Sequence, residues 1–252
     1  MKEAVDEALA VALGTSITRT TRLAGGASKE AWAVHTDDGR ELLLRRAGGG
    51  VIHLDTLSLR QEFDVLVAAR HAGVRVPKPI AYLGDLDGRE AFVMELVHGE
   101  AIGRRIVKAP PPGLDLQMAE ELAKIHSIPP TTLPFLPSHD LWERLYAELD
   151  SVEEPHPAIE LGIVWCRERL PLERPHVVTH GDFRLGNLMI DEKGRVHLAN
   201  GHGYQKRTRC DYDTRVHGDG LVACASLRAV NLGKWFMEKN RYSVEVFKTL
   251  QE

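Results

Sequence analysis

The spacing of hydrophobic positions changes part-way along the chain, from short strand-like runs to helical stripes. Before residue 100, apolar or Thr- and Ile-rich segments of strand length alternate with Gly-containing turns, as antiparallel strands do. The pair Asp38-Gly39 predicts the tight turn of a β-hairpin. The predicted strands cover 16–23, 31–36, 41–46, the segment ending at Asp85, and 90–100 up to a break at His98-Gly99.

Helical periodicity is confined to two early segments, 3–13 and 57–73, and dominates after residue 100. The later predicted helices cover 114–128, 139–152 and 156–170. Within 114–128, one stripe is predicted to hold Leu116, Ala119, Leu122, Ala123 and His126. A short strand at 176–179 and a hairpin turning at 192–194 follow.

This order predicts an α+β fold with two lobes, because strands and helices are segregated and do not alternate as βα units. We expect a small antiparallel-sheet lobe over 1–97 and a mainly helical lobe over 98–252. Short Gly- and Pro-rich patches at 47–50 and 109–113 are typical of loops, not linkers.

Composition narrows the function classes. The 252 residues are 43% hydrophobic and 27% charged, with a net charge of −4, so no overall basic field predicts nucleic-acid binding. The basic run at 205–215 has few stacking aromatics. No apolar run is long enough to cross a membrane, and the amphipathic start is unlike a signal peptide. Three scattered cysteines favour a reducing cytosol.

The string "HGDFRLGN" (180–187) carries the candidate chemistry. Phosphoryl transfer to a hydroxyl needs a carboxylate near the acceptor oxygen and oxygen ligands for Mg²⁺ on the phosphates. Asp182 and Asn187, five positions apart on one loop, supply both kinds of group. An Asx turn on a surface loop is the competing interpretation, but the apolar segments on both sides favour a buried setting.

The string "VVTHGDFRLGNLMID" resembles the catalytic loop of the aminoglycoside phosphotransferase and choline kinase family, relatives of the protein kinases. The resemblance covers about the first 198 residues and is strongest to the subgroup that also occurs fused to acyl-CoA dehydrogenases. The other matching pieces, in order, are "LAGGASKEAW", "LLLRR", "LRQEFDVLVAARHAGVRVPKPI", "FVMELVHGE" and "MAEELAKIHSI". The family implies a protein-kinase-like fold and transfer of the γ-phosphate of ATP, with Mg²⁺, to a hydroxyl of a small molecule. By the same resemblance, the lobe over 1–97 would bind the nucleotide and the lobe over 98–252 would carry the catalytic and substrate groups.

By this resemblance Asp182 matches the catalytic Asp and Asn187 the metal-binding Asn. Arg45 stands where the family usually has a phosphate-contacting Lys, which keeps the charge but changes the shape. Glu62 matches the helix carboxylate that holds this base, with a solvated helix Glu as the competing interpretation. His180 is expected to pack and orient the loop.

Two further parts of the predicted nucleotide site follow from the same resemblance. Ser28, in the Gly-rich segment, would offer its hydroxyl and backbone N–H to a phosphate. A plain Gly hairpin remains the alternative there. The segment 94–97 would bind adenine through its backbone, with Glu95 and Val97 as the contacting positions.

The resemblance fails after residue 199. The family has a metal-binding Asp where this chain has Asn200, and an amide oxygen lacks the charge that Mg²⁺ on a triphosphate prefers. Three explanations stay open: a weakened or inactive kinase, a substitute carboxylate from Asp211, Asp213 or Asp219, and a pseudokinase that binds nucleotide or a partner. We also expect a shortened helical lobe, because the family continues beyond this length.

Overall fold

The computed structural model of the chain describes residues 2–23, 29–48, 57–136, 138, 141–152, 154–169, 176–181, 183, 185–198 and 205–208. Three of the predicted site residues, Ser28, Asp182 and Asn200, lie outside the described residues. The basic segment after residue 208, with its three candidate carboxylates, also lies outside them.

Five antiparallel strands form the N-terminal sheet in the order β1-β2-β3-β5-β4. They are β1 (Ile17–Arg22), β2 (Lys29–Thr36), β3 (Glu41–Ala47), β4 (Pro79–Asp85) and β5 (Glu90–Glu95). The β2–β3 hairpin turns at Asp38-Gly39, where Gly39 has a φ of 82° that residues with a Cβ rarely adopt. The predicted hairpin is therefore confirmed.

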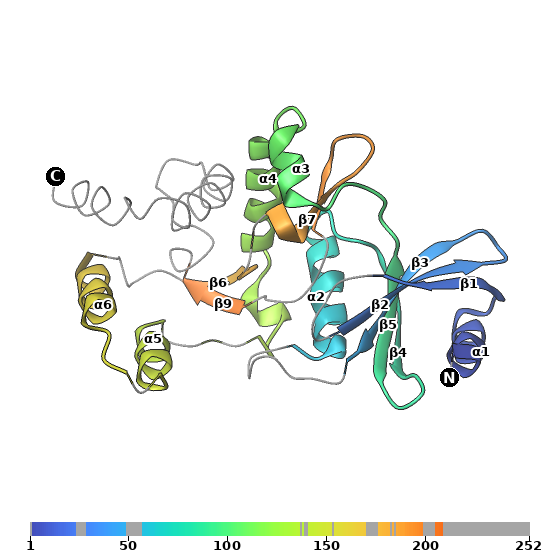
Figure 1. Cartoon of the computed structure of the whole chain (residues 1–252), viewed down its shortest axis with the longest axis horizontal. Coiled ribbons are helices and arrows are strands. Elements are labelled where there is room, and N and C mark those ends of the chain that lie inside the picture. Colours follow the sequence, from blue (N-terminus) through green and yellow to red (C-terminus); the bar gives the residue numbers. More distant parts are fainter. Residues whose placement is uncertain are drawn as a thin grey trace.

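Helices α1 (Lys2–Leu13) and α2 (Leu59–His71) lie on opposite faces of this sheet (Figure 1). Side chains alternate along β3, so Leu42 and Leu44 join the cluster that contains Leu9 of α1, whereas Leu43 packs against the cluster under α2. Odd-numbered β3 residues therefore point toward α2, which decides where Arg45 lies.

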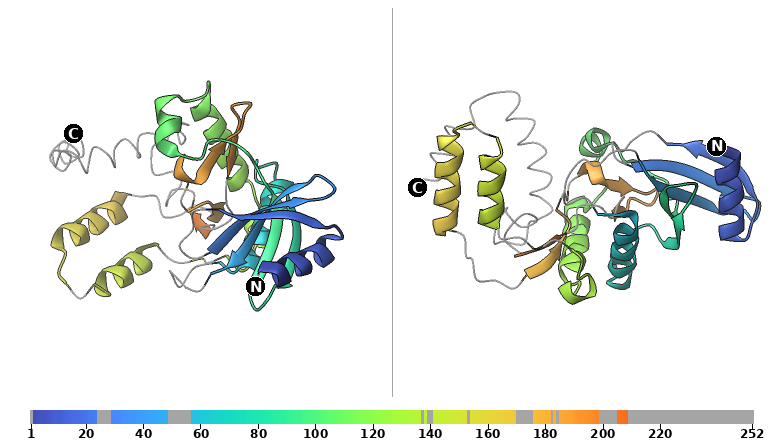
Figure 2. Two further views of the ribbon diagram at one scale, coloured as in Figure 1. Left: turned by 45° about the vertical axis from the view of Figure 1, so that its right-hand side comes forward. Right: turned by 90° about the horizontal axis from the view of Figure 1, so that it is seen from below.

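The second part of the chain is mainly helical, and the strand-then-helix order confirms the predicted α+β class. Its helices are α3 (Gly103–Lys108), α4 (Leu114–His126), the 3₁₀ turn η1 (Pro130–Thr132), α5 (Leu141–Asp150) and α6 (Pro157–Arg169). Two short antiparallel pairs complete it: β6 (His176–Thr179) with β9 (Gln205–Thr208), and, after the 3₁₀ turn η2 (Leu185–Asn187), β7 (Leu188–Ile190) with β8 (Val196–Leu198). Figures 1 and 2 show α5 and α6 as a pair set apart from the sheet.

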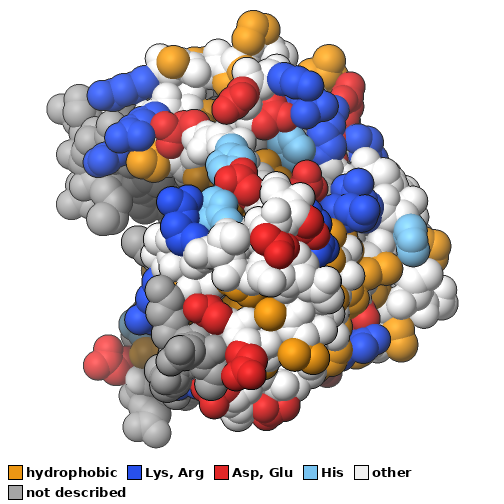
Figure 3. All heavy atoms as spheres, turned by 90° about the vertical axis from the view of Figure 1, so that its right-hand side faces the viewer, with side chains coloured by type: hydrophobic (Ala, Val, Ile, Leu, Met, Phe, Trp, Pro, Cys, Tyr) orange, Lys and Arg blue, Asp and Glu red, His pale blue; other side chains and the backbone are white. Residues whose placement is uncertain are grey.

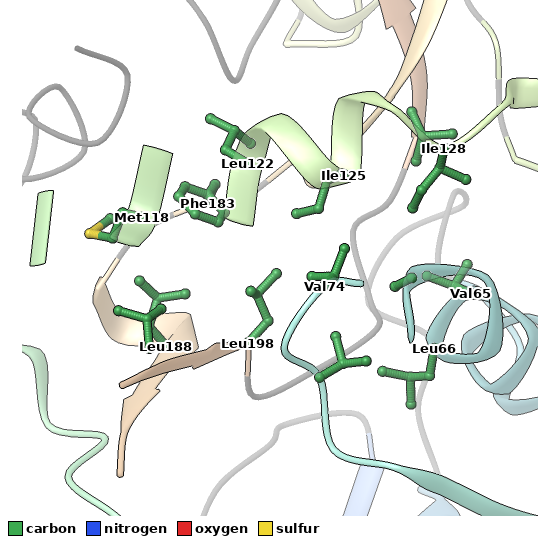
Figure 4. Close-up of a cluster of buried hydrophobic side chains, with 14 of the residues drawn as sticks. Val65, Leu66, Val74, Met118, Leu122, Ile125, Ile128, Phe183, Leu188 and Leu198 are labelled. Atoms are coloured by element: carbon green, nitrogen blue, oxygen red, sulfur yellow. The ribbon is translucent and has the colours of Figure 1, made fainter. Parts of the chain in front are cut away.

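One hydrophobic cluster joins the sheet side to the helical side (Figure 4). Val65 and Leu66 of α2, Met118 and Ile125 of α4, and Leu198 of β8 all belong to it, and all are almost fully buried. Because α2, α4 and the β7–β8 hairpin share this core, their relative positions are set by close packing. In the described part of the chain, no helix is both long and apolar enough to span a bilayer.

Several predictions about individual elements were wrong. The α4 stripe was misplaced: Leu116 is 62% exposed, and the buried face instead comprises Leu114, Met118, Glu121, Leu122 and Ile125. Strand β2 begins at Lys29, two residues before the predicted start. Helix α3 and strand β9 were not predicted.

Candidate functional site

Two cationic side chains project from the sheet toward α2. In the antiparallel register of β2 and β3, Ala31 lies opposite Arg45 and Lys29 lies opposite Ala47. Residues opposite one another or two apart share a face, so Lys29 and Arg45 are diagonal neighbours on the α2 side. Lys29 was not among the predicted site residues.

The N-terminus of α2 is held by two capping arrangements. Ser58 and Gln61 form a capping box, in which the Ser58 hydroxyl accepts from the Gln61 amide and the Gln61 side chain accepts from the Ser58 amide. Across from the sheet, Glu90 of β5 accepts from the backbone N–H groups of Leu59 and Arg60, both at 2.9 Å. A carboxylate at this end also complements the helix dipole.

Burial by itself would raise the pKa of Glu90. The hydrogen bond from the Tyr82 hydroxyl, the two α2 amides and the nearby Lys29 charge outweigh it, so the Glu90 pKa lies below its ordinary value of 4.5. Glu90 is therefore held as a carboxylate at neutral pH and anchors the first turn of α2 in its charged form.

This anchored first turn places Glu62 against the two cations. Glu62 is 0% exposed, so the interpretation of it as a solvated helix residue was wrong. Its Oε1 accepts from Lys29 Nζ in a close ion pair, and its Oε2 lies 3.5 Å from a terminal nitrogen of Arg45. The Lys29 and Arg45 side chains are themselves only 10% and 16% exposed.

The Arg45 side of this cluster is incompletely bonded. Among the described residues, neither Arg45 Nε nor Glu62 Oε2 has a hydrogen-bond partner, although both atoms are buried. Buried polar atoms are normally paired, because an unmade hydrogen bond leaves the desolvation cost uncompensated. An anion beside Arg45 would supply the missing acceptor.

The segment after β5 leads from the sheet to the helices. The Glu95 amide donates to the Lys78 carbonyl at 2.8 Å, and the Leu96 amide donates to the Glu41 carbonyl at 3.3 Å. Within the described residues, no backbone–backbone hydrogen bond engages Val97. The predicted adenine contact at this position stays a prediction.

A charged network on the surface holds the same segment. His98 Nε2 lies 2.7 Å from Glu41 Oε2, and His35 Nδ1 lies 3.2 Å from Glu41 Oε1. The hydrogen bond from His98 is the main reason that the Glu41 pKa is lowered. On the face drawn in Figure 3, acidic, basic and histidine side chains lie intermixed in this way.

The segment then meets the β7–β8 hairpin. Glu100 and Ile190 exchange two backbone hydrogen bonds of 2.9 Å. Gly99 fits so closely here that a Cβ would lie 2.2 Å from the Ile190 carbonyl oxygen. This close approach requires glycine and fixes the hairpin against the end of the sheet.

The loop that precedes β7 packs inward. His180 is fully buried, and its ring lies edge-on to Phe183 with centroids 5.7 Å apart, as expected for a side chain that orients the loop. Gly181 has a φ of 77°, a conformation that favours glycine. Asn187, at the end of η2, is 8% exposed. Asp182, the other residue of the predicted catalytic pair, lies outside the described residues.

A second ionic cluster holds the far side of the hairpin. The side-chain oxygen of Gln117 on α4 accepts from the Val196 amide at 3.0 Å, and its side-chain nitrogen donates to the Gly194 carbonyl at 3.0 Å. The Leu198 amide donates to the Arg75 carbonyl at 2.9 Å. Arg75 in turn contacts the buried Glu121 of α4. The β7–β8 hairpin is therefore held by α4 and by the backbone of Arg75.

The comparisons with known proteins agree with this arrangement. The model of the phosphotransferase enzyme family matches residues 19–197. The chain belongs to the phosphotransferase enzyme family. A region of mouse acyl-CoA dehydrogenase family member 10 is 29% identical over 222 residues. That match covers 77% of this chain and 20% of the mouse protein, so the chain spans about a fifth of this relative.

Solved structures of phosphotransferases share the fold. Spectinomycin phosphotransferase, in complex with ADP and spectinomycin, has a TM-score of 0.58 at 14% identity, covering 81% of this chain and 69% of that one. A choline kinase from Streptococcus pneumoniae has a TM-score of 0.58 at 16% identity, covering 82% and 70%. A macrolide 2'-phosphotransferase from Brachybacterium faecium has a TM-score of 0.60 at 14% identity, covering 89% and 81%. The kinase-like fold that the sequence predicts is confirmed.

The structure of this family member brings some predicted site residues together. Arg45 and Glu62 lie within an ion-pair distance, and Glu95 and Val97 lie on the segment that follows β5. Lys29 was missed because it was assigned to the Gly-rich loop. Its position directly after "GGAS", where a strand can begin, was the signal that could have identified it.

Proposed function

We propose that this phosphotransferase transfers the γ-phosphate of ATP to a hydroxyl of a small molecule, in the reducing cytosol. The observation that supports this most is the buried Glu62 beside two cations at the start of β2 and near the end of β3. Cations at this position, next to a Gly-rich segment, suit the phosphate groups of a nucleotide.

The nucleotide would lie between these cations and the segment after β5. Arg45 would contact the phosphates, and Ser28 would cover them from the Gly-rich segment. The Glu95 carbonyl and the Val97 backbone would bind adenine. Related solved structures contain ADP, AMP and GDP, which supports a nucleotide as the ligand class.

The catalytic loop would supply the groups that act on the acceptor. Asp182 would orient the acceptor hydroxyl and accept its proton as the oxygen attacks the γ-phosphate. The buried Asn187 would hold Mg²⁺ through its side-chain oxygen, and bound Mg²⁺ would neutralise charge on the phosphates. The fit is partial, because Asn200, at the place of the family's metal-binding Asp, offers no charge.

A small-molecule alcohol is the acceptor class that the family supports. The related structures are named for spectinomycin, a macrolide and choline, which share a hydroxyl and little else. The acceptor panel for this chain therefore begins with aminocyclitols, macrolides, choline and simple sugars.

The test is ADP release, coupled to an optical readout, with each acceptor in the presence of MgATP. We expect one class of acceptor to stimulate release and Asp182→Ala to reduce kcat by at least about a hundredfold. Asp150→Asn, at an exposed position on α5, is the matched control and should leave the rate unchanged. Equal rates for the Asp182→Ala variant and the wild type would contradict the role of Asp182.

An inactive nucleotide-binding protein is the second candidate, and Asn200 favours it. Thermal unfolding with ATP, with and without Mg²⁺, separates the two: an enzyme should bind ATP more tightly with Mg²⁺, whereas a pseudokinase can bind it equally well without. Asn200→Asp restores the family carboxylate. A gain in turnover in this variant would show that the amide is what limits catalysis.

A further inference from the structure

Lys29 and Arg45 engage Glu62 unequally. Lys29 Nζ makes a close ion pair with Glu62 Oε1, whereas the Arg45 nitrogen lies 3.5 Å from Oε2, beyond a good hydrogen bond. Glu62 is fully buried, so its charge must be compensated nearby. The lysine therefore supplies most of that compensation.

Lys29 also holds the chain that enters α2. Its Nζ donates to the Leu57 carbonyl at 2.8 Å, one residue before the Ser58 cap. Two of the three ammonium donors are thus used on α2 and its approach. Because Lys29 is the first residue of β2, these contacts tie the strand after the Gly-rich segment directly to the helix.

Arg45 has no comparable bonds. Its Nε is buried without a hydrogen-bond partner among the described residues. The adjacent Arg46, on the opposite face, is satisfied: it donates to the Leu86 carbonyl at 3.2 Å and the Asp87 carbonyl at 2.8 Å. The difference between two neighbouring arginines of one strand singles out Arg45 as the one that lacks an acceptor.

No other carboxylate in the described cluster completes Arg45. Glu90 is close enough to Lys29 for that charge to help lower its pKa, but its oxygens accept from the Leu59 and Arg60 amides and the Tyr82 hydroxyl. Lys29 and Arg45 therefore share one carboxylate, Glu62. The Arg45 guanidinium keeps unused N–H donors that can bind the oxygens of a ligand such as a phosphate.

We propose that Lys29 is the positioning residue that neutralises Glu62 and fixes α2, and that Arg45 is thereby left to bind phosphate groups. This division of labour differs from the expectation that Glu62 holds Arg45. It rests on the proposed nucleotide site for its phosphate ligand. The role of Lys29 toward Glu62 stands on the contacts alone.

The test compares Lys29→Met with Arg45→Met in two measurements. Thermal unfolding without ligand reports which cation supports Glu62, and we expect the larger fall in Tm for Lys29→Met. Calorimetric titration with inorganic tripolyphosphate reports the phosphate site without an adenine contact. There we expect a loss of about a hundredfold for Arg45→Met and about tenfold for Lys29→Met, in which Glu62 draws Arg45 away.

A double variant makes the positioning role specific. Lys29→Met/Glu62→Gln removes the uncompensated carboxylate, so it should fold and recover tripolyphosphate affinity to within about threefold of wild type. A residue that touched phosphate itself would show no such recovery. Arg104→Gln, which removes a charge at an exposed position of α3, is the control and should change neither measurement.

The outcomes separate this inference from the proposed function. A larger fall in Tm for Arg45→Met, or a loss of affinity in Lys29→Met that Glu62→Gln does not reverse, would overturn the inference. Absence of tripolyphosphate binding by the wild type would overturn the role of Arg45. If tripolyphosphate binds as expected but MgATP does not, the inference stands and the proposed ATP-dependent activity fails.

Discussion

Two buried carboxylates of this chain, Glu62 on α2 and Glu121 on α4, are both 0% exposed and both have two cationic partners. At Glu121 every oxygen is well bonded. Oε1 accepts from Lys124 at 2.6 Å, and Oε2 accepts from the Arg75 amide at 2.7 Å. At Glu62 one oxygen has no hydrogen bond, and neither has one nitrogen of its Arg45 partner.

The exposure of the cationic partners also differs between the two clusters. Arg75 and Lys124 are 30% and 33% exposed, so water shares their solvation, whereas Lys29 and Arg45 are 10% and 16% exposed. A network in which each buried polar atom has a hydrogen bond is what a purely structural contact between elements requires. A buried cation that lacks an acceptor, as Arg45 does, is what a site for an anionic ligand requires. Hydrogen-bond satisfaction, more than burial or charge, distinguishes the two clusters.

The same substitution at both carboxylates tests this distinction most strongly. Glu121→Gln should lower the free energy of unfolding by about 3–5 kcal/mol, because it breaks a fully bonded buried network that positions the β7–β8 hairpin. Urea denaturation measures the change. ATP affinity, measured below the unfolding range, should stay close to that of the wild type, and a selective loss of affinity would contradict a purely structural role.

Glu62→Gln should cost less, about 2–3 kcal/mol, because only one of its oxygens loses a charge-assisted hydrogen bond. Denaturation under the same conditions allows direct comparison with Glu121→Gln. ATP affinity should be retained or increased, since Arg45 no longer faces a competing carboxylate. A loss of affinity greater than the loss caused by Lys29→Met would show that Glu62 holds Arg45 after all.

The contact between the segment after β5 and the β7–β8 hairpin can also be broken, at the backbone of Gly99. Gly99→Ala places a methyl group on the Ile190 carbonyl oxygen, so it should destabilise the protein by about 1–3 kcal/mol and disturb the β7–β8 hairpin. Thermal unfolding measures the effect. Gly162→Ala is the control: it lies in α6 with nothing within 4 Å, and should stabilise by about 0.5–1 kcal/mol. Equal changes in stability in the two variants would argue against close packing of Gly99 on Ile190.

The smallest expected effect concerns Glu90, which anchors the cation-bearing region. The folded-state pKa of Glu90 is depressed, so its stabilisation is present above its ordinary pKa of 4.5 and is lost as pH falls through the lower folded value. Glu90→Gln should therefore cost about 1 kcal/mol near pH 7 and progressively less below pH 4.5. Unfolding curves across this pH range measure it. A constant difference at every pH would contradict the assignment.

Local patterns predicted much of this fold because they report interactions between near neighbours. The β2–β3 hairpin follows from Asp38-Gly39, where the required positive φ selects the residue. The catalytic-loop string and the order of the flanking pieces predicted the family, which matches residues 19–197. These features depend on backbone conformation and short-range spacing, so they can be predicted from the amino-acid sequence.

The predictions that were wrong involve polar residues on buried faces. The α4 stripe was displaced because Glu121 occupies the buried face, which a hydrophobic pattern excludes, and Leu116 is exposed instead. Glu62 was left as either the helix carboxylate that holds Arg45 or a solvated residue, and Lys29 was assigned to a loop. In each case the partner that makes burial tolerable lies far away in the sequence.

The amino-acid sequence by itself therefore determined the family, the α+β order and the candidate catalytic loop around Asp182 and Asn187. Only the tertiary structure decided that Lys29 is in a strand, that it shares Glu62 with Arg45, and that Glu121 is buried in a structural ion-pair network. The physical reason is that charge compensation acts through space: Lys29 and Glu62 are 33 positions apart in the chain, and Arg75 and Glu121 are 46 apart.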